Sequence, residues 1–420
     1  LGDHRGEAEA LSMRGMTSLF AGEANEAEAS IRQALDVFRS LGDTRDEAWA
    51  LWNLAWISFE EGRLVQAEER LEKSARAFTE ARDWGGLSWA HGLLGFVKYF
   101  QGDRAEAERI ALRVIDGVAE SGDRWAYGMV LVLLAGVRLW EGRTAEAVEP
   151  ARDAVEQFTG MSDIRGQGLS YATLARALAA SGRVREAMAV LDRADQELPE
   201  KMLMPVATFA RAATALHIGD PAMAQAALAG WTTDESFAGD MTQAEGQILL
   251  GVGLLQTGKA AKALRAVEAA LANASSDGTR ANALALLALA SAADGRPSAA
   301  VETADEVFAI PVATYLDRTT ALVARGCALV QAGDEGGMRA AFDEAERIID
   351  GTSDRVSQAT VRLARGRALE QLGSADAVGV LQTARTRLDA MGLAADGWDT
   401  AFRLACGAGT PSPSPVADQA

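Results

Sequence analysis

Side chains that build metal centres, nucleophilic sites and disulfides are scarce in this sequence. It contains three histidines and two cysteines in 420 residues. Cys327 and Cys406 match no metal-ligand or redox spacing. The histidines, no two of which are spaced like metal ligands, are His4, His91 and His217. No G-x-S-x-G nucleophile motif occurs either. We therefore expect no enzyme, no metal and no cofactor, and the sparse cysteines fit a reducing cytoplasm.

Long apolar runs and an excess of positive charge are also absent. No segment has the length and purity needed to cross a bilayer, and no signal peptide is recognisable, so we expect no membrane partner. The formal net charge of −18 argues against direct binding of the nucleic-acid backbone, but it is compatible with a basic peptide or protein surface. The sequence begins at Leu1 inside a turn motif, and we expect it to be a segment of a longer polypeptide.

Proline, which interrupts helices, is scarce as well, whereas a turn glycine recurs at a regular spacing along the chain. The nine prolines and the abundance of alanine and leucine favour helix over strand. Residues 41–80 show the unit: two amphipathic helical patterns flank a break at Gly62. The equivalent glycines, spaced by 40 and then by 37 to 40 residues, are Gly22, Gly62, Gly102, Gly142, Gly182, Gly219, Gly258, Gly295, Gly333 and Gly373. Ten helical hairpins are predicted.

Small residues keep a fixed distance from each turn glycine, as expected where two helices approach closely. Seven residues before it stand Gly15, Ala55, Gly95, Ala135, Ala175, Ala212, Gly251, Ala288, Gly326 and Gly366. Five residues after it stand Ala27, Ala67, Ala107, Ala147, Ala187, Ala224, Ala263 and Ala300, then Met338 and Val378.

This pattern resembles the tetratricopeptide repeat (TPR), a two-helix unit with a small residue in each helix. The usual unit is nearer 34 residues. At about 40, the unit is more similar to the longer repeats at the C-terminal end of many bacterial signalling proteins. These include maltose-activator-type and antibiotic-pathway transcriptional regulators, signal-transduction ATPases and nucleotide cyclases. The resemblance covers roughly residues 1–405 and implies an all-α, right-handed α-solenoid of about ten hairpins and twenty helices.

Two charged patterns have structural explanations. Five aspartates between successive hairpins, predicted to cap the helix that follows each one, are Asp3, Asp43, Asp83, Asp123 and Asp163. Four arginines occupy a slot that leucine fills elsewhere: Arg14, Arg211, Arg325 and Arg365. We expect each arginine to lie along the hairpin seam and reach water or a carboxylate, although an anion clamp is the alternative.

Breaks in the rhythm suggest how the chain divides. Pro199 and Pro205 bracket an apolar run, which predicts a joint between an N-terminal half-array of residues 1–198 and a C-terminal half-array of residues 199–406. Trp231 to Asp240 is predicted to be a longer loop, and the Pro- and Ser-rich residues 407–420 a disordered tail.

Aromatic residues concentrate in hairpins two to four, where they form a stripe at helical spacing. The predicted ligand- or partner-binding residues are Trp49, Trp52, Trp56, Phe59, Trp89, Phe96, Tyr99 and Trp140. In TPR arrays the inner face of the first helix usually forms the binding groove, so the resemblance places the stripe there. Packing between repeats is an equally weighted explanation. Uneven distribution along the array favours recognition, because a stripe that served only packing should recur evenly.

Two functions follow from this pattern. The first is a non-enzymatic recognition module, the regulatory segment of a larger bacterial signalling or transcription-regulatory protein with an effector domain upstream. It would bind a peptide, a protein segment or an apolar ligand on the stripe. The alternative is a structural scaffold that self-associates into a homo-oligomer and binds no small ligand.

Overall fold

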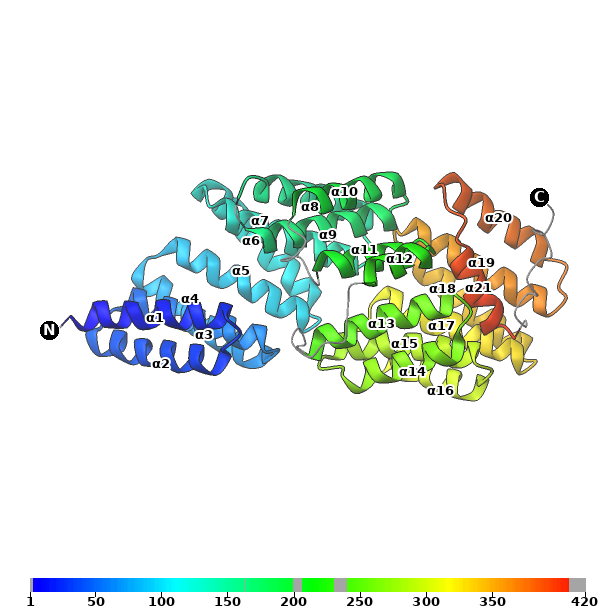
Figure 1. Cartoon of the computed structure of the whole chain (residues 1–420), viewed down its shortest axis with the longest axis horizontal. Coiled ribbons are helices and arrows are strands. Elements are labelled where there is room, and N and C mark those ends of the chain that lie inside the picture. Colours follow the sequence, from blue (N-terminus) through cyan, green and yellow to red (C-terminus); the bar gives the residue numbers. More distant parts are fainter. Residues whose placement is uncertain (1–2, 162, 199–205, 230–239, 408–420) are drawn as a thin grey trace. The chain divides into compact units, whose positions relative to one another are not determined.

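The computed structural model describes residues 3–161, 163–198, 206–229 and 240–407, and every regular element in these ranges is a helix. The fold is an all-α helical-repeat solenoid (Figure 1). The helices are α1 (His4–Phe20), α2 (Ala24–Leu41), α3 (Thr44–Glu60), α4 (Leu64–Ala81), α5 (Trp84–Phe100), α6 (Arg104–Ser121), α7 (Arg124–Trp140), α8 (Thr144–Phe158), α9 (Ile164–Ala180), α10 (Val184–Glu197), α11 (Val206–His217), α12 (Pro221–Leu228), α13 (Asp240–Gln256), α14 (Ala260–Ala272), α15 (Asp277–Ala293), α16 (Pro297–Phe308), α17 (Tyr315–Gln331), α18 (Glu335–Asp350), α19 (Arg355–Gln371), α20 (Ala377–Ala390) and α21 (Asp396–Ala405). None of these described helices combines the length and the apolar character that a bilayer crossing requires.

Turn glycines separate the two helices of each hairpin, as predicted. All ten have positive φ, from 69° upward, a conformation that glycine adopts without the strain of a Cβ. The hairpins pair α1 with α2 and continue to α19 with α20. The expected number of hairpins is therefore confirmed.

Close helix approach explains the small residues. A Cβ built on Gly95 would lie 2.5 Å from Leu133 Cδ2, and one on Gly366 would lie 2.6 Å from Leu381 Cδ2. The residue predicted for the second close-approach position is wrong in the tenth hairpin, because Val378 is 72% exposed and Ala377 is buried instead. Helix α20 begins at Ala377, four residues after Gly373, so the register there is shifted by one.

The aspartate caps are confirmed. Each of the five carboxylates accepts a hydrogen bond from the backbone N–H three residues later, at 2.8 to 3.2 Å. The arginines follow the seam interpretation. Arg211, Arg325 and Arg365 each donate to carboxylates on the second helix of the preceding hairpin, and Arg14 donates to Ser30 Oγ within its own hairpin.

One described helix was not predicted. Helix α21 follows the tenth hairpin and packs against α13, α15, α17 and α19. Its exposed face carries charged residues, whereas Ala401, Phe402 and Ala405 are buried. Among the described residues, α21 is the last helix and has no hairpin partner.

Contacts divide the chain into two compact units. Unit 1 comprises Leu1–Val137 with Glu156–Phe158, and unit 2 comprises Arg138–Val155 with Thr159–Ala420. The predicted joint at 199–205, residues 231–239 of the predicted loop and the tail from residue 408 lie outside the described residues. The boundary between residues 198 and 199 and the handedness of the superhelix stay predictions.

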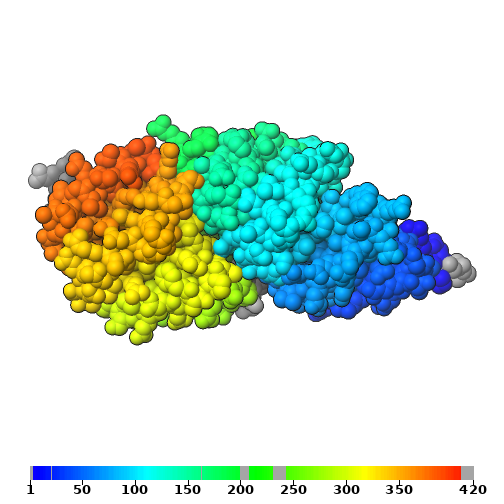
Figure 2. All heavy atoms as spheres, turned by 180° about the vertical axis from the view of Figure 1, so that it is seen from behind, coloured from blue at the N-terminus to red at the C-terminus, as the bar shows by residue number. Residues whose placement is uncertain are grey.

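Unit 2 brings hairpins that are distant in sequence together. Helix α9 contacts α19, and Figure 2 shows the green atoms of this segment against the orange atoms of α19 and α20. At the α7–α8 turn, the backbone N–H of Ser353 donates to Gly142 O at 2.8 Å. The Ser353–Gly142 bond joins residues that are 211 positions apart in the sequence.

Candidate functional site

Five tryptophans of unit 1 form one cluster, which we call the aromatic surface: Trp49, Trp52 and Trp56 on α3, Trp89 on α5 and Trp125 on α7. The Trp89 and Trp125 rings are stacked, with centroids 4.6 Å apart and planes 8° from parallel. Trp52 meets the edge of Trp89 at 5.5 Å. Trp56 reaches Trp125 at 6.4 Å. The first helices of three successive hairpins therefore share one group of indoles.

The rings differ in burial. Trp52 is 5% exposed and belongs to the core of hairpins two and three. Trp49, Trp56 and Trp89 pack on that core but are only partly buried, and Trp125 is half-buried as well. The surface thus has an inner ring, Trp52, that supports four outer rings with solvent-facing atoms.

Hydrogen bonds fix two of the indoles between hairpins. Trp52 Nε1–H donates to Trp89 O at 3.2 Å, and Trp89 Nε1–H donates to Asp123 Oδ2 at 2.9 Å. The other oxygen of Asp123 caps α7 by accepting from the Ala126 N–H at 3.0 Å. One carboxylate therefore fixes both the start of α7 and the orientation of Trp89.

Trp49 stands in the same relation to Asp83. Burial alone would raise the pKa of Asp83, but hydrogen bonds from the Gly86 amide, Arg45 and the Trp49 indole lower it. An indole and the capping aspartate 34 residues later thus connect hairpin two to hairpin three, as Trp89 and Asp123 connect three to four.

The other predicted site residues are placed unevenly. Phe59 and Phe96 are half-buried, and Phe59 contacts the Phe100 ring at 5.5 Å. Tyr99 is 9% exposed and meets Phe100 at 5.1 Å, so most of its area is already buried within the array. Trp140 is half-buried and belongs to unit 2.

Gly92 of α5 has free space above its Cα, which we call the opening at Gly92. Gly92 shares a helix face with Trp89 and Phe96, three residues before it and four after it. A Cβ built there would have a single neighbour within 4 Å, Val130 Cγ2 at 4.0 Å. Gly92 is half-buried, and a larger side chain has room at this position.

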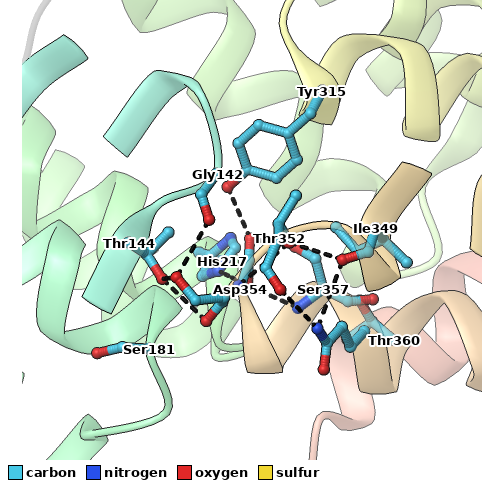
Figure 3. A network of polar contacts seen from close by, with 12 residues as sticks. Gly142, Thr144, Ser181, His217, Tyr315, Ile349, Thr352, Asp354, Ser357 and Thr360 are labelled. Carbon is cyan, nitrogen blue, oxygen red and sulfur yellow. Dashed lines mark hydrogen bonds and ion pairs between the residues drawn. The ribbon is translucent and has the colours of Figure 1, made fainter. Parts of the chain in front are cut away.

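A second polar cluster, in unit 2, surrounds the buried carboxylate of Asp354 (Figure 3). Tyr315 Oη donates to Asp354 at 2.9 Å, and the Ser357 N–H and hydroxyl donate at 2.9 and 2.7 Å. His217 Nε2 lies 3.4 Å from the same carboxylate. Burial would raise the pKa of Asp354, but His217 and the Ser357 donors lower it.

This cluster joins parts of unit 2 that are distant in sequence. Thr144 Oγ1 donates to Ser353 O at 2.9 Å across 209 residues, and Ser353 Oγ donates to Gly142 O. The serine hydroxyls are thus directed at backbone oxygens and at Asp354, not at His217. Within the described residues, no group of three or more histidine, cysteine, aspartate or glutamate side chains is arranged to hold a metal ion.

Comparison with known proteins identifies the repeats. A tetratricopeptide repeat model matches residues 6–80 and 46–120, and a second one matches residues 168–193. Residues 6–120 and 168–193 are therefore tetratricopeptide repeats. No curated protein sequence matches it.

Solved structures agree on the fold. A monomeric mutant of IFIT1 with Gppp-AAAA is 15% identical, with a TM-score of 0.53, and the match covers 94% of this chain and 90% of that one. A human IFIT1 dimer with PPP-AAAA is 16% identical, with a TM-score of 0.50 and coverage of 93% and 89%. At these identities the likeness concerns the helical-repeat fold alone.

In TPR terms, the aromatic surface lies on the first helices of hairpins two to four. Sequence analysis missed Trp125. It precedes Met129 by one helical turn, and Met129 is the residue of hairpin four that is equivalent to Trp89, so Trp125 shares the face of the stripe. It also missed Gly92, because an absent side chain gives no signal at helical spacing. Repeat families of this kind are generally binding modules rather than catalysts, since stacking produces extended surfaces.

Proposed function

We propose that this chain is a non-enzymatic recognition module that binds a peptide or protein segment through the aromatic surface of unit 1. The observation that carries the proposal is the group of partly exposed rings, Trp56, Trp89 and Trp125, together with the free space at Gly92 on the helix that bears Trp89. An apolar side chain of the partner would enter this opening. An apolar small ligand is the other occupant compatible with this surface.

Preorganisation supports a binding role. Indoles bury a large area with few rotatable bonds, and here ring contacts and the Trp89–Asp123 hydrogen bond hold them before any partner arrives. The net charge of −18 favours a basic over an acidic peptide. We therefore expect the preferred segment to combine an aromatic or aliphatic anchor with flanking lysine or arginine.

The biological setting we propose is regulatory. The array would be the sensor segment of a larger cytoplasmic bacterial signalling or transcription-regulatory protein, attached to an effector domain. Because each repeat mainly contacts its neighbours, a peptide bound across α3, α5 and α7 would bias the stacking of these hairpins. That change is what an attached domain would sense.

The test uses peptides selected on the whole chain from a random phage-displayed library and then synthesised. We expect Trp56→Ala to weaken binding by about tenfold or more, as removal of a central aromatic anchor does. Gly92→Leu should do the same by filling the opening. The matched control is Trp84→Ala, because Trp84 is 63% exposed on the same helix and outside the cluster. Equal losses in all three variants would refute the assignment of the site.

The alternative function is a scaffold that self-associates through exposed apolar side chains. Trp84 and Val65 of unit 1 are 63% and 69% exposed. Light scattering over a range of concentrations distinguishes the two functions. A dimer that dissociates in Trp84→Glu and that selects no peptides would favour the scaffold.

A further inference from the structure

The two cysteines of this chain are 79 residues apart in sequence, yet their sulfur atoms lie 3.0 Å apart. Cys327 is on α17, and Cys406 is the C-cap residue that directly follows α21. Both side chains are buried, with 0% and 1% exposed. A disulfide has a bond length of about 2.05 Å, so bond formation requires a relative movement of about 1 Å.

Independent contacts hold α21 in the position that brings the thiols together. Gln331 Nε2, one turn after Cys327, donates to Ala405 O at 2.6 Å. Arg367, which is 3% exposed, binds both oxygens of Asp399 at 2.6 and 2.7 Å. Trp398 Nε1–H donates to His217 O at 3.0 Å. The thiols are therefore placed by the docking of α21 and not by a chance approach of two mobile side chains.

We propose that Cys327 and Cys406 are an oxidation site, at which a disulfide ties the terminal helix α21 to hairpin nine. The oxidant is a low-molecular-weight disulfide of the glutathione class. One cysteine thiolate attacks a sulfur of the oxidant and releases one small thiol, which leaves a mixed disulfide. The second cysteine thiolate then attacks the protein sulfur of that mixed disulfide and releases the second small thiol. Two protein thiols are oxidised, one small disulfide is reduced to two thiols, and the two protons end on those thiols.

Burial sets the conditions of this reaction. The hydrogen bond from Cys406 to Cys327 and the surrounding apolar atoms raise the pKa of the Cys406 thiol. Little of the Cys406 thiol is therefore ionised while α21 is docked. The oxidant must also reach sulfur atoms that are buried in the docked state. We therefore expect reaction during brief openings of α21, after which redocking joins the sulfurs. The disulfide then prevents further opening.

The experiment measures the redox equilibrium of the whole chain in glutathione buffers. One set of samples starts from the reduced protein and another from protein oxidised in urea. The oxidised fraction is followed until the two sets reach the same value. We expect an intramolecular disulfide that links the two expected tryptic peptides. The effective concentration of the thiols should be about tenfold or more above that measured in urea. The oxidised chain should melt on the order of 5 °C higher than the reduced chain, because a long loop is closed.

Two variants keep the proposal falsifiable. Cys327→Ser should lose the melting difference between oxidising and reducing buffers. Trp398→Ala removes a docking contact of α21 without touching either sulfur, so it should increase the rate of thiol alkylation and lower the effective concentration. Formation of glutathione adducts or intermolecular dimers in place of the internal disulfide would overturn the proposal. An effective concentration no higher in the folded chain than in urea would overturn it as well.

Discussion

Two glycines on α5, one turn apart, should respond in opposite ways to the same substitution. Gly92→Ala adds a methyl group whose one neighbour within 4 Å is Val130 Cγ2 at 4.0 Å, an ordinary contact. The gain is then the helix propensity of alanine over glycine, about 0.5 to 1 kcal/mol. Gly95→Ala gains the same amount but places its methyl group 2.5 Å from Leu133 Cδ2.

Leu133 has no room to yield. It is 1% exposed on α7, and such overpacking costs about 1 to 3 kcal/mol. We therefore expect Gly92→Ala to be more stable than wild type and Gly95→Ala to be less stable, with a difference of about 2 kcal/mol between the two variants.

Tryptophan fluorescence during urea unfolding is the appropriate assay, because six of the nine tryptophans lie between residues 49 and 125. The signal therefore reports mainly on unit 1, which contains both glycines. Shifts of the same sign and size in the two variants would refute the reasoning. So would a Gly92→Ala variant that is destabilised, because the space above Gly92 would then have to be filled.

Acid should destabilise unit 1 through Glu28. Burial would raise the pKa of this carboxyl, but hydrogen bonds from Arg70 and two other arginines lower the pKa to about 2. The unfolded chain binds that proton first, so the contribution is complete above about pH 4.5 and is lost as the pH falls toward 2. The upper limit of this contribution to the free energy of unfolding is about 3 kcal/mol. In Glu28→Gln, the free energy of unfolding in urea should therefore fall less between about pH 4.5 and pH 2 than in the wild type, and an unchanged pH profile would contradict this. Asp43→Ala should cost about 1 kcal/mol by removing a cap, whereas Asp123→Ala should cost about 1 to 2 kcal/mol more, because the Trp89 indole also loses its acceptor. Urea titrations of both variants check the difference, and equal losses would show that the indole contact is worth nothing.

The features that could be predicted from the sequence are those that one repeat determines. A turn needs a residue with positive φ, so Gly62 and its equivalents are visible at any position along the array. Helix crossing needs a small residue, and a helix start needs an acceptor, so the alanine and aspartate positions recur with them. Where one repeat departs from the pattern, as at Val378, a local shift of one residue was enough to mislead the prediction.

Contacts between distant repeats could not be predicted in this way. The meeting of Thr144 with Ser353 depends on small rotations that accumulate over many hairpins, and the meeting of Cys327 with Cys406 depends on how α21 docks. The sequence of a single repeat does not contain the accumulated rotation. Helix α21 was missed for a related reason, because it belongs to no hairpin and its apolar face is complementary to several first helices at once.

The aromatic surface shows how packing and recognition separate once the contacts are known. Trp49 and Trp89 occupy equivalent positions, and each is connected to the capping aspartate of the next hairpin. That recurrence is what packing between repeats requires. Trp56 and Trp125 come from α3 and α7, and their ring centroids lie 6.4 Å apart. Neither is repeated at the equivalent position of the neighbouring hairpin, where Phe96 and Gly85 stand, so the uneven distribution of tryptophan is informative for these two rings. Substitution of Trp89 should change stability before it changes binding, and substitution of Trp56 should do the reverse.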